Sequence, residues 1–334
     1  ERFKNKSSSN LLSLQEANEN KLDLNWKEVN TTSPSFLGVR NLESISIDTL
    51  RPYIDWTPFF KSWSLAGSYP KILNDGVVGE AATQLFNDAN KMLDELEKTK
   101  IITNKSVIGF WPASQDNNNQ VKLYKDENRE DVLVNLNFPR QQRFQGQGNP
   151  NLSLSDFIAP KKEGFRDYIG AFAVTSGIGV EKACSDYENN NDDYSSILLK
   201  AIADRLAESL AEYVHEKVRK EYWGYSANEE LNNKELIKEK YVGIRPAPGY
   251  PACPDHSEKV KLFSLLNAVK EVDISLTENF AMLPAASISG WYFSNVESKY
   301  FGLGKITEEQ VKSISKNRDE DVKLIRKYYS TNLE

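Results

Sequence analysis

Hydrophobic residues recur along this chain at two spacings, which predict helices in some stretches and strands in others. A spacing of three to four residues, typical of a helix with one buried side, is clearest over residues 78–98 and 193–223. Shorter helices are expected at residues 11–20, 234–240 and 260–272. The Thr-Glu-Glu-Gln sequence at 307–310 resembles a capping box and predicts that the last helices begin there.

Apolar runs between these helices predict strands. Residues 107–111 are expected to form a short buried strand, and residues 131–138 alternate as a half-buried strand does. A third strand, at 168–175, should end at the glycines that follow it. Two more are predicted at 286–293 and 300–306, with a hairpin-like connection over 294–299. Because helices and strands mix without strict alternation, the pattern favours an α+β fold.

The long helix at 193–223 has an apolar stripe on one side and charged residues on the other. Asp204, Glu208 and His215 fall on this polar side together with two alanines. A charged side is usually just solvated, but small residues would let a ligand or a partner approach the helix closely.

The composition narrows the class of protein. The 334 residues are 39% hydrophobic, enough for a core, and the net charge of −6 comes without a basic block for nucleic acid or an anionic membrane. No apolar run is long enough to span a bilayer, and the first residues given lack the apolar segment of a signal peptide. It does not start with methionine, so we expect it to be part of a longer protein.

Two cysteines and two histidines provide neither a disulfide framework nor a zinc site with sensible spacing, so we expect no metal. Cytosol is the natural compartment for such a chain, and a monomer is expected. Cys253 and His256 lie three residues apart, but no third group to orient them is evident, so a catalytic pair is not favoured.

The sequence IRPAPGYPACPDHSEK at 244–259 is the most distinctive stretch. Its four prolines exclude a helix and a central strand, which leaves a stiff, extended arm with a low ordering cost on binding. Arg245 offers a fork for a carboxylate and Tyr250 a flat aromatic face. A purely structural loop that packs against a helix start is the alternative.

This stretch closely resembles the S-adenosylmethionine-binding loop in the C-terminal activation domain of cobalamin-dependent methionine synthase. Further matches to that family follow in order along the chain. They are RPYIDWTPFF at 51–60, DYIGAFAV at 167–174, DDY at 192–194, SGWYFS at 289–294 and SKYF at 298–301. The resemblance therefore runs from about residue 50 to the C-terminus, and it implies one large α+β domain with a central, curved antiparallel sheet flanked by helices.

The resemblance also implies a ligand and a task. The chain would bind S-adenosylmethionine and place its methyl group for reductive methylation of cob(II)alamin to methylcobalamin. Cobalamin would come from a neighbouring module of the parent chain, and the electron from a flavodoxin-like donor. The parent enzyme would make methionine from homocysteine and methyltetrahydrofolate. No catalytic side chain is required, and the chain alone is expected to be inactive.

Residue by residue, the resemblance assigns ligand binding to eight positions. Arg245 suits the carboxylate of S-adenosylmethionine, and Asp55 or Glu208 suits its ammonium group. The others would contact it through backbone groups or aromatic faces: Ala247, Gly249, Tyr250, Tyr300 and Phe301. Asp55 has a competing structural role as the N-cap of a short helix.

Asp204 and Tyr250 are candidates for the interface with the cobalamin-bearing module. The expected organisation is a linker and N-terminal arm over residues 1–30, with the binding domain over 31–334. Two other functions remain open: a docking module that senses S-adenosylmethionine without turnover, and a free-standing methyltransferase. The absence of a Gly-x-Gly-x-x-Gly sequence after a strand argues against the latter.

Overall fold

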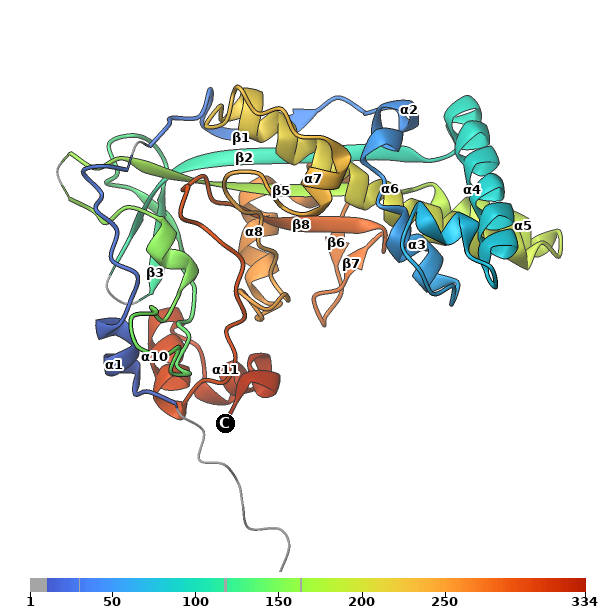
Figure 1. Cartoon of the computed structure of the whole chain (residues 1–334). Coiled ribbons are helices and arrows are strands. Elements are labelled where there is room, and N and C mark those ends of the chain that lie inside the picture. Colours follow the sequence, from blue (N-terminus) through green and yellow to red (C-terminus); the bar gives the residue numbers. More distant parts are fainter. Residues whose placement is uncertain (1–10, 30, 117–118, 163) are drawn as a thin grey trace, which may run out of the picture.

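The computed structural model describes residues 11–29, 31–116, 119–162 and 164–334 (Figure 1). The expected linker at residues 1–10 lies outside the described residues. The arm that follows contains a short helix, α1 (Leu14–Glu19), which begins at Ser13 with a complete capping box to Glu16. Leu12 of this arm donates a backbone hydrogen bond to Gln142, so the arm lies against the body of the domain.

A six-stranded antiparallel sheet forms the centre of the molecule, in the order β4-β3-β2-β5-β8, with β1 paired to β2 as well. β1 and β3 pair with successive parts of the same side of β2. In Figure 1 the β3 end of the sheet bends away from the direction of β2 and β5. The strands are β1 (Gly38–Leu42), β2 (Thr103–Gln115), β3 (Gln120–Tyr124), β4 (Val132–Asn137), β5 (Asp167–Ile178) and β8 (Ser287–Tyr292). β6 (Ser275–Leu276) and β7 (Met282–Leu283) form a separate hairpin.

Both faces of the sheet are buried under a hydrophobic core. Successive side chains along β2 and β5 point alternately into these two cores. Phe110 and Phe172 belong to one core, and Trp111 and Ala171 to the other. The first core lies under α2, α3, α4 and α6, and the second under α8 and α9. The prediction of an α+β domain with a central antiparallel sheet flanked by helices is confirmed.

The helices predicted from periodicity are present, with somewhat different bounds. Those of the first layer are α2 (Ile47–Leu50), α3 (Trp56–Ser62), α4 (Gly79–Thr99) and α6 (Asp193–Lys217). The others are α5 (Val180–Asn189), α7 (Asn233–Ile237), α8 (Glu258–Leu266), α9 (Ala268–Val272), α10 (Glu308–Arg318) and α11 (Val322–Tyr328). α6 continues into a π-helical turn, Val218–Tyr222, and this completes the long helix expected to residue 223.

Four expectations are wrong. Residues 300–306 form no strand, so residues 294–299 are not a hairpin connection. The predicted helix at 260–272 is two helices, because Asn267 adopts a left-handed conformation between α8 and α9. α10 does begin at Glu308 after Thr307, but the capping box is absent, because the Thr307 hydroxyl pairs with Gln142. His215 is fully buried against Tyr292 and does not belong to a solvated side of α6.

Candidate functional site

The proline-rich loop is attached to the free edge of β8. Ile244 exchanges two backbone hydrogen bonds with Phe293, each 3.0 Å, and the carbonyl of Pro246 accepts one from Trp291 at 2.9 Å. Gly290 of β8 permits this approach, because a Cβ there would lie 2.8 Å from the Pro246 carbonyl oxygen. The loop is therefore held beside the sheet through Ile244 and Pro246, while the N–H of Arg245, between them, bonds to Tyr300 instead.

A cavity of about 480 Å³ lies between this loop, α6 and the sheet. Six of the residues proposed from the sequence line it: Glu208, Arg245, Ala247, Tyr250, Tyr300 and Phe301. They come from three separate parts of the chain, which the fold brings together. The remaining lining residues are Phe172, Glu239, Pro246, Pro251, Ala252 and Ile288.

Arg245 is fixed at both its backbone and its guanidinium. Its N–H donates to the Tyr300 hydroxyl at 3.0 Å, and its Nη2 donates to Glu212 at 2.8 Å. Its Nη1 is buried and has no hydrogen-bond partner. An unpaired buried guanidinium donor is costly, and Arg245 is one of the residues that line the cavity, so the cavity is suited to an anionic group.

Glu239 was not predicted from the sequence. It follows α7 with a left-handed backbone conformation, φ +54°, and lines the cavity together with Glu208. It lies only six residues before Arg245, but no motif marks it. The cavity therefore has two carboxylates and one guanidinium, and that guanidinium is already paired with Glu212.

Gly249 and Asp55 are not among the residues that line this cavity. Gly249 has φ +100°, and its N–H donates to the carbonyl of Cys253 at 2.7 Å. A Cβ at this position would lie 2.2 Å from the His256 ring, so only glycine fits the turn. Asp55 accepts a hydrogen bond from the Thr57 N–H at 3.0 Å as the N-cap of α3, which is the structural alternative considered for it.

Cys253 and His256 are not arranged as a catalytic pair. Burial raises the pKa of the Cys253 thiol well above its usual value, so the thiolate is disfavoured. The Nδ1 atom of His256 pairs with Lys259 Nζ at 2.8 Å. Within the described residues, no cluster of three or more His, Cys, Asp or Glu side chains is placed to hold a metal ion.

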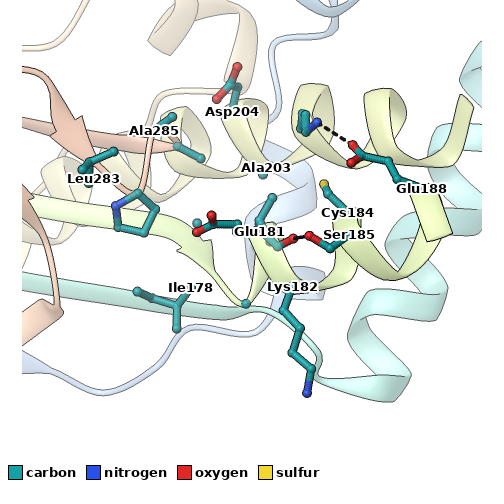
Figure 2. A pocket seen from close by; sticks show the side chains of 16 residues that line it. Ile178, Glu181, Lys182, Cys184, Ser185, Glu188, Ala203, Asp204, Leu283 and Ala285 are labelled. Atoms are coloured by element: carbon teal, nitrogen blue, oxygen red, sulfur yellow. Dashed lines mark hydrogen bonds and ion pairs between the residues drawn. The ribbon is translucent and has the colours of Figure 1, made fainter. Parts of the chain in front are cut away.

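A second and larger cavity, about 1020 Å³, lies further along α6 (Figure 2). Asp204 and Ala203 border it from α6, and Leu283 and Ala285 border it from the segment before β8. Asp204 precedes Glu208 by one helical turn, so a single side of α6 borders both cavities. Burial raises the pKa of the Asp204 carboxyl above its usual value.

Comparison with known proteins places these features in context. The family model described as "Vitamin B12 dependent methionine synthase, activation domain" matches residues 46–319. A solved structure described as "Crystal Structure of the MetH Reactivation Domain bound to AdoHcy" is 47% identical to this chain. The match covers 97% of this chain and 98% of that one, with a TM-score of 0.94. No helix within the described residues combines the length and the apolar content needed to cross a membrane.

Proposed function

The chain belongs to the activation-domain family of vitamin B12 dependent methionine synthase, and from this premise we propose that it is the reactivation module of such an enzyme. It binds S-adenosylmethionine in the cavity beside Arg245 and directs the methyl group toward a cobalamin-bearing module of the same parent chain. The parent enzyme, a cytoplasmic methyltransferase, makes methionine from homocysteine and methyltetrahydrofolate.

The observation that carries this proposal is the charge arrangement of the cavity. S-adenosylmethionine has one carboxylate and two cationic centres, the ammonium and the sulfonium. Arg245 lines the cavity and has one Nη without a hydrogen-bond partner, so it would bind the carboxylate, and Glu208 and Glu239 would bind the cations. Tyr250, Tyr300 and Phe301 supply aromatic surface, which attracts a sulfonium and stacks on an adenine.

Three further residues complete the proposed site. Ala247 borders the cavity and would contact the ligand through its backbone, and Gly249 keeps the loop in shape. Asp55 remains a candidate for the ammonium group, since its N-cap bond uses only one of its two carboxylate oxygens. The similar structure, a MetH reactivation domain bound to AdoHcy, supports a ligand of this class.

The protein contributes placement. When bound nearby, cobalamin would supply the cobalt that accepts the methyl group, and a flavodoxin-like donor the electron that restores methylcobalamin from cob(II)alamin. The residues of this chain hold the donor so that its methyl carbon faces the partner module, which is a proximity effect. Tyr250, with 63% of its surface exposed, and Asp204 on the second cavity are the proposed contacts with that module.

Calorimetric titration with S-adenosylmethionine tests the binding site. Arg245→Ala should weaken binding by about 1.5–3 kcal/mol, the range for hydrogen bonds to charged groups. Arg245→Lys should recover only part of this loss, because lysine lacks the fork geometry. Arg326→Ala is a matched control, since this arginine forms an exposed ion pair with Glu308 on the C-terminal helices.

Saturable binding by wild type and by the Arg326 control, with a loss confined to the Arg245 variants, is the expected result. Equal affinity for Arg245→Ala and wild type would remove Arg245 from the site. If folded wild-type protein releases no heat at millimolar ligand, the proposed function itself fails.

A further inference from the structure

Behind the cavity, four side chains of alternating charge form a continuous buried chain. Arg245 Nη2 lies 2.8 Å from Glu212 Oε2, and Glu212 Oε1 lies 3.7 Å from Arg219 Nη1. Arg219 in turn makes a two-pronged bond to Glu229, at 2.7 Å from Nη2 and 2.9 Å from Nε. The chain therefore starts at the wall of the cavity and continues into the interior.

From the cavity to Arg219, each member of this network is more deeply buried than the one before, and Glu229 at its far end is 6% exposed. The Arg245 side chain is 18% exposed, Glu212 is 11% exposed and Arg219 is fully buried. Charges in such a place are retained only when each is paired, because an unpaired buried charge costs several kcal/mol. Removing Glu212 would leave the two arginines facing each other without the anion between them.

Aromatic rings pack against the network. The Arg219 guanidinium lies 4.5 Å from the centre of the Tyr241 ring, and His215 stacks on Tyr292. Burial, together with the positive charges of Arg219 and Arg245, lowers the pKa of His215 well below its usual value. This shift favours the neutral form of His215, and the Glu212 carboxylate lies between the two guanidinium groups.

The local fold explains how Glu212 and Arg219 meet. Glu212 is one turn after Glu208 on α6, whereas Arg219 is on the π-helical turn that ends this helix. π-helical turns are rare and frequently occur at functional sites. Here the turn carries Arg219, which lies beside the Glu212 carboxylate behind the cavity.

We propose that Glu212 and Arg219 are positioning residues that hold Arg245 ready for the carboxylate of the ligand. This inference rests on the proposed function and adds to it two residues that do not line the cavity. Glu212 occupies one Nη of Arg245 and leaves Nη1 free, so the fork is oriented before the ligand arrives. A fixed arginine loses less conformational entropy on binding than a mobile one.

The test compares two ligands, one with and one without the amino-acid part. S-adenosylhomocysteine carries the carboxylate, whereas 5′-methylthioadenosine has the nucleoside and thioether alone. Glu212→Gln keeps the volume and one oxygen acceptor, but its amide N–H groups then face a guanidinium. We expect about tenfold weaker binding of S-adenosylhomocysteine, in line with loss of a charge-assisted contact. Binding of 5′-methylthioadenosine should be unchanged.

A double variant shows whether Glu212 acts through Arg245. In an Arg245→Met background, Glu212→Gln should cause no further loss of S-adenosylhomocysteine affinity, because the residue it positions is gone. This double variant also removes both partners of the buried pair, which protects the fold better than a single change. Glu216→Gln is the matched control, since Glu216 lies on the next turn of α6 and pairs with Tyr53 and Lys220.

Three results would overturn the inference. They are equal losses for both ligands, unchanged affinity in Glu212→Gln, and additive losses in the double variant. These outcomes are distinct from failure of the proposed function, which would appear as absence of binding by the wild-type protein.

Discussion

Glu208, Glu239 and Arg245 are the charged residues that line the cavity. The charge of the Arg245 guanidinium is already balanced by Glu212. Such a site favours a ligand with a net positive charge. S-adenosylmethionine carries one more positive charge than S-adenosylhomocysteine. The site should therefore bind the methyl donor more tightly than the demethylated product.

Glu239→Gln should reduce this preference. The side chain is exposed, so we expect a loss of about 0.3–1 kcal/mol in the affinity ratio of the two ligands, as for exposed ion pairs. The ratio is obtained from calorimetric titrations with each ligand. Glu230→Gln, at an exposed position away from the cavity, is the control. A ratio unchanged by Glu239→Gln would show that this carboxylate does not sense the sulfonium charge.

Asp167, at the start of β5, is a buried carboxyl group. Burial raises the pKa of its carboxyl from 3.8 to about 7, although the N–H groups of Ala159 and Tyr168 and the charge of Arg129 act in the opposite direction. Between these values the folded state binds more protons than the unfolded state. The stability contributed by this group is therefore present below about pH 4 and is lost as the pH rises through 7.

The variant Asp167→Asn cannot titrate, so its unfolding free energy should fall less than that of wild type between pH 5 and pH 7.5. Urea unfolding of both proteins at the two pH values measures this difference. Parallel pH profiles for the two proteins would mean that Asp167 keeps an ordinary pKa in the folded state.

Individual site residues differ in how far the sequence reveals them. Arg245 and Tyr300 belong to distinctive motifs and meet through the hydrogen bond from the Arg245 N–H to the Tyr300 hydroxyl. Glu239 and Glu212 carry no such mark, because a glutamate near a helix end or on a helix resembles any solvated one. Their roles depend on which side chains of other elements surround them, and that information is not local.

Among the elements, the end of the proline-rich loop depends on the C-terminal helices. Arg318, the last residue of α10, forms ion pairs with Asp255 and Glu258 and donates to the Ser257 hydroxyl at 3.0 Å. Both carboxylates are almost completely buried. The Asp-His-Ser-Glu sequence after the loop is therefore an anchor for α10 and for the start of α8.

Arg318→Ala should lower the free energy of unfolding by about 3–5 kcal/mol, because it leaves the buried Asp255 carboxylate without its cationic partner, whereas Glu258 keeps its ion pair with Lys261. Urea unfolding monitored by tryptophan fluorescence gives the value. The exposed pair of Arg326 and Glu308 on the same helices offers the comparison, and Arg326→Ala should cost at most about 1 kcal/mol. Similar losses for the two variants would contradict an anchoring role for Arg318.

Helices and strands were predicted well where their apolar pattern in the sequence is long and regular. α4 and α6 were identified because their apolar stripes are long and regular. β2 was predicted as five residues but has 13, since its ends contain polar residues that tertiary pairing accommodates. The apolar residues at 300–306 suggested a strand, but Leu303 and Ile306 instead pack against α10 and α11.

For the whole molecule, the relevant feature is that α6 borders two cavities side by side. Arg245 and Glu208 face the first, where we propose that the methyl donor binds, and Asp204 faces the second. The sheet and its two buried cores hold these surfaces in a fixed relation. Helical spacing in the sequence predicted that Asp204 and Glu208 share one side of this helix, but the two cavities beside them follow only from the packing of α6 on the sheet.

The last prediction concerns transfer between modules. Mixed with a separate cobalamin-bearing module, S-adenosylmethionine and a one-electron reductant, this chain should support formation of methylcobalamin at a rate proportional to its concentration. A covalent linker normally supplies an effective concentration of about millimolar, so micromolar mixtures should react on the order of a thousand times more slowly than a fused protein. The absorbance change on conversion of cob(II)alamin reports the reaction.

Asp204→Ala should slow this transfer while leaving the affinity for S-adenosylmethionine unchanged, because Asp204 borders the second cavity and not the first. Asp131→Ala, an exposed aspartate just before β4, is the matched control and should behave as wild type. If methylcobalamin forms at the same rate without the chain, the chain has no role in transfer and is a ligand-sensing module. Methyl groups on a small acceptor in the absence of cobalamin would instead identify a free-standing methyltransferase. Only a rate that depends on the chain, on Asp204 and on the linker agrees with a module whose contribution is to bring two bound groups together.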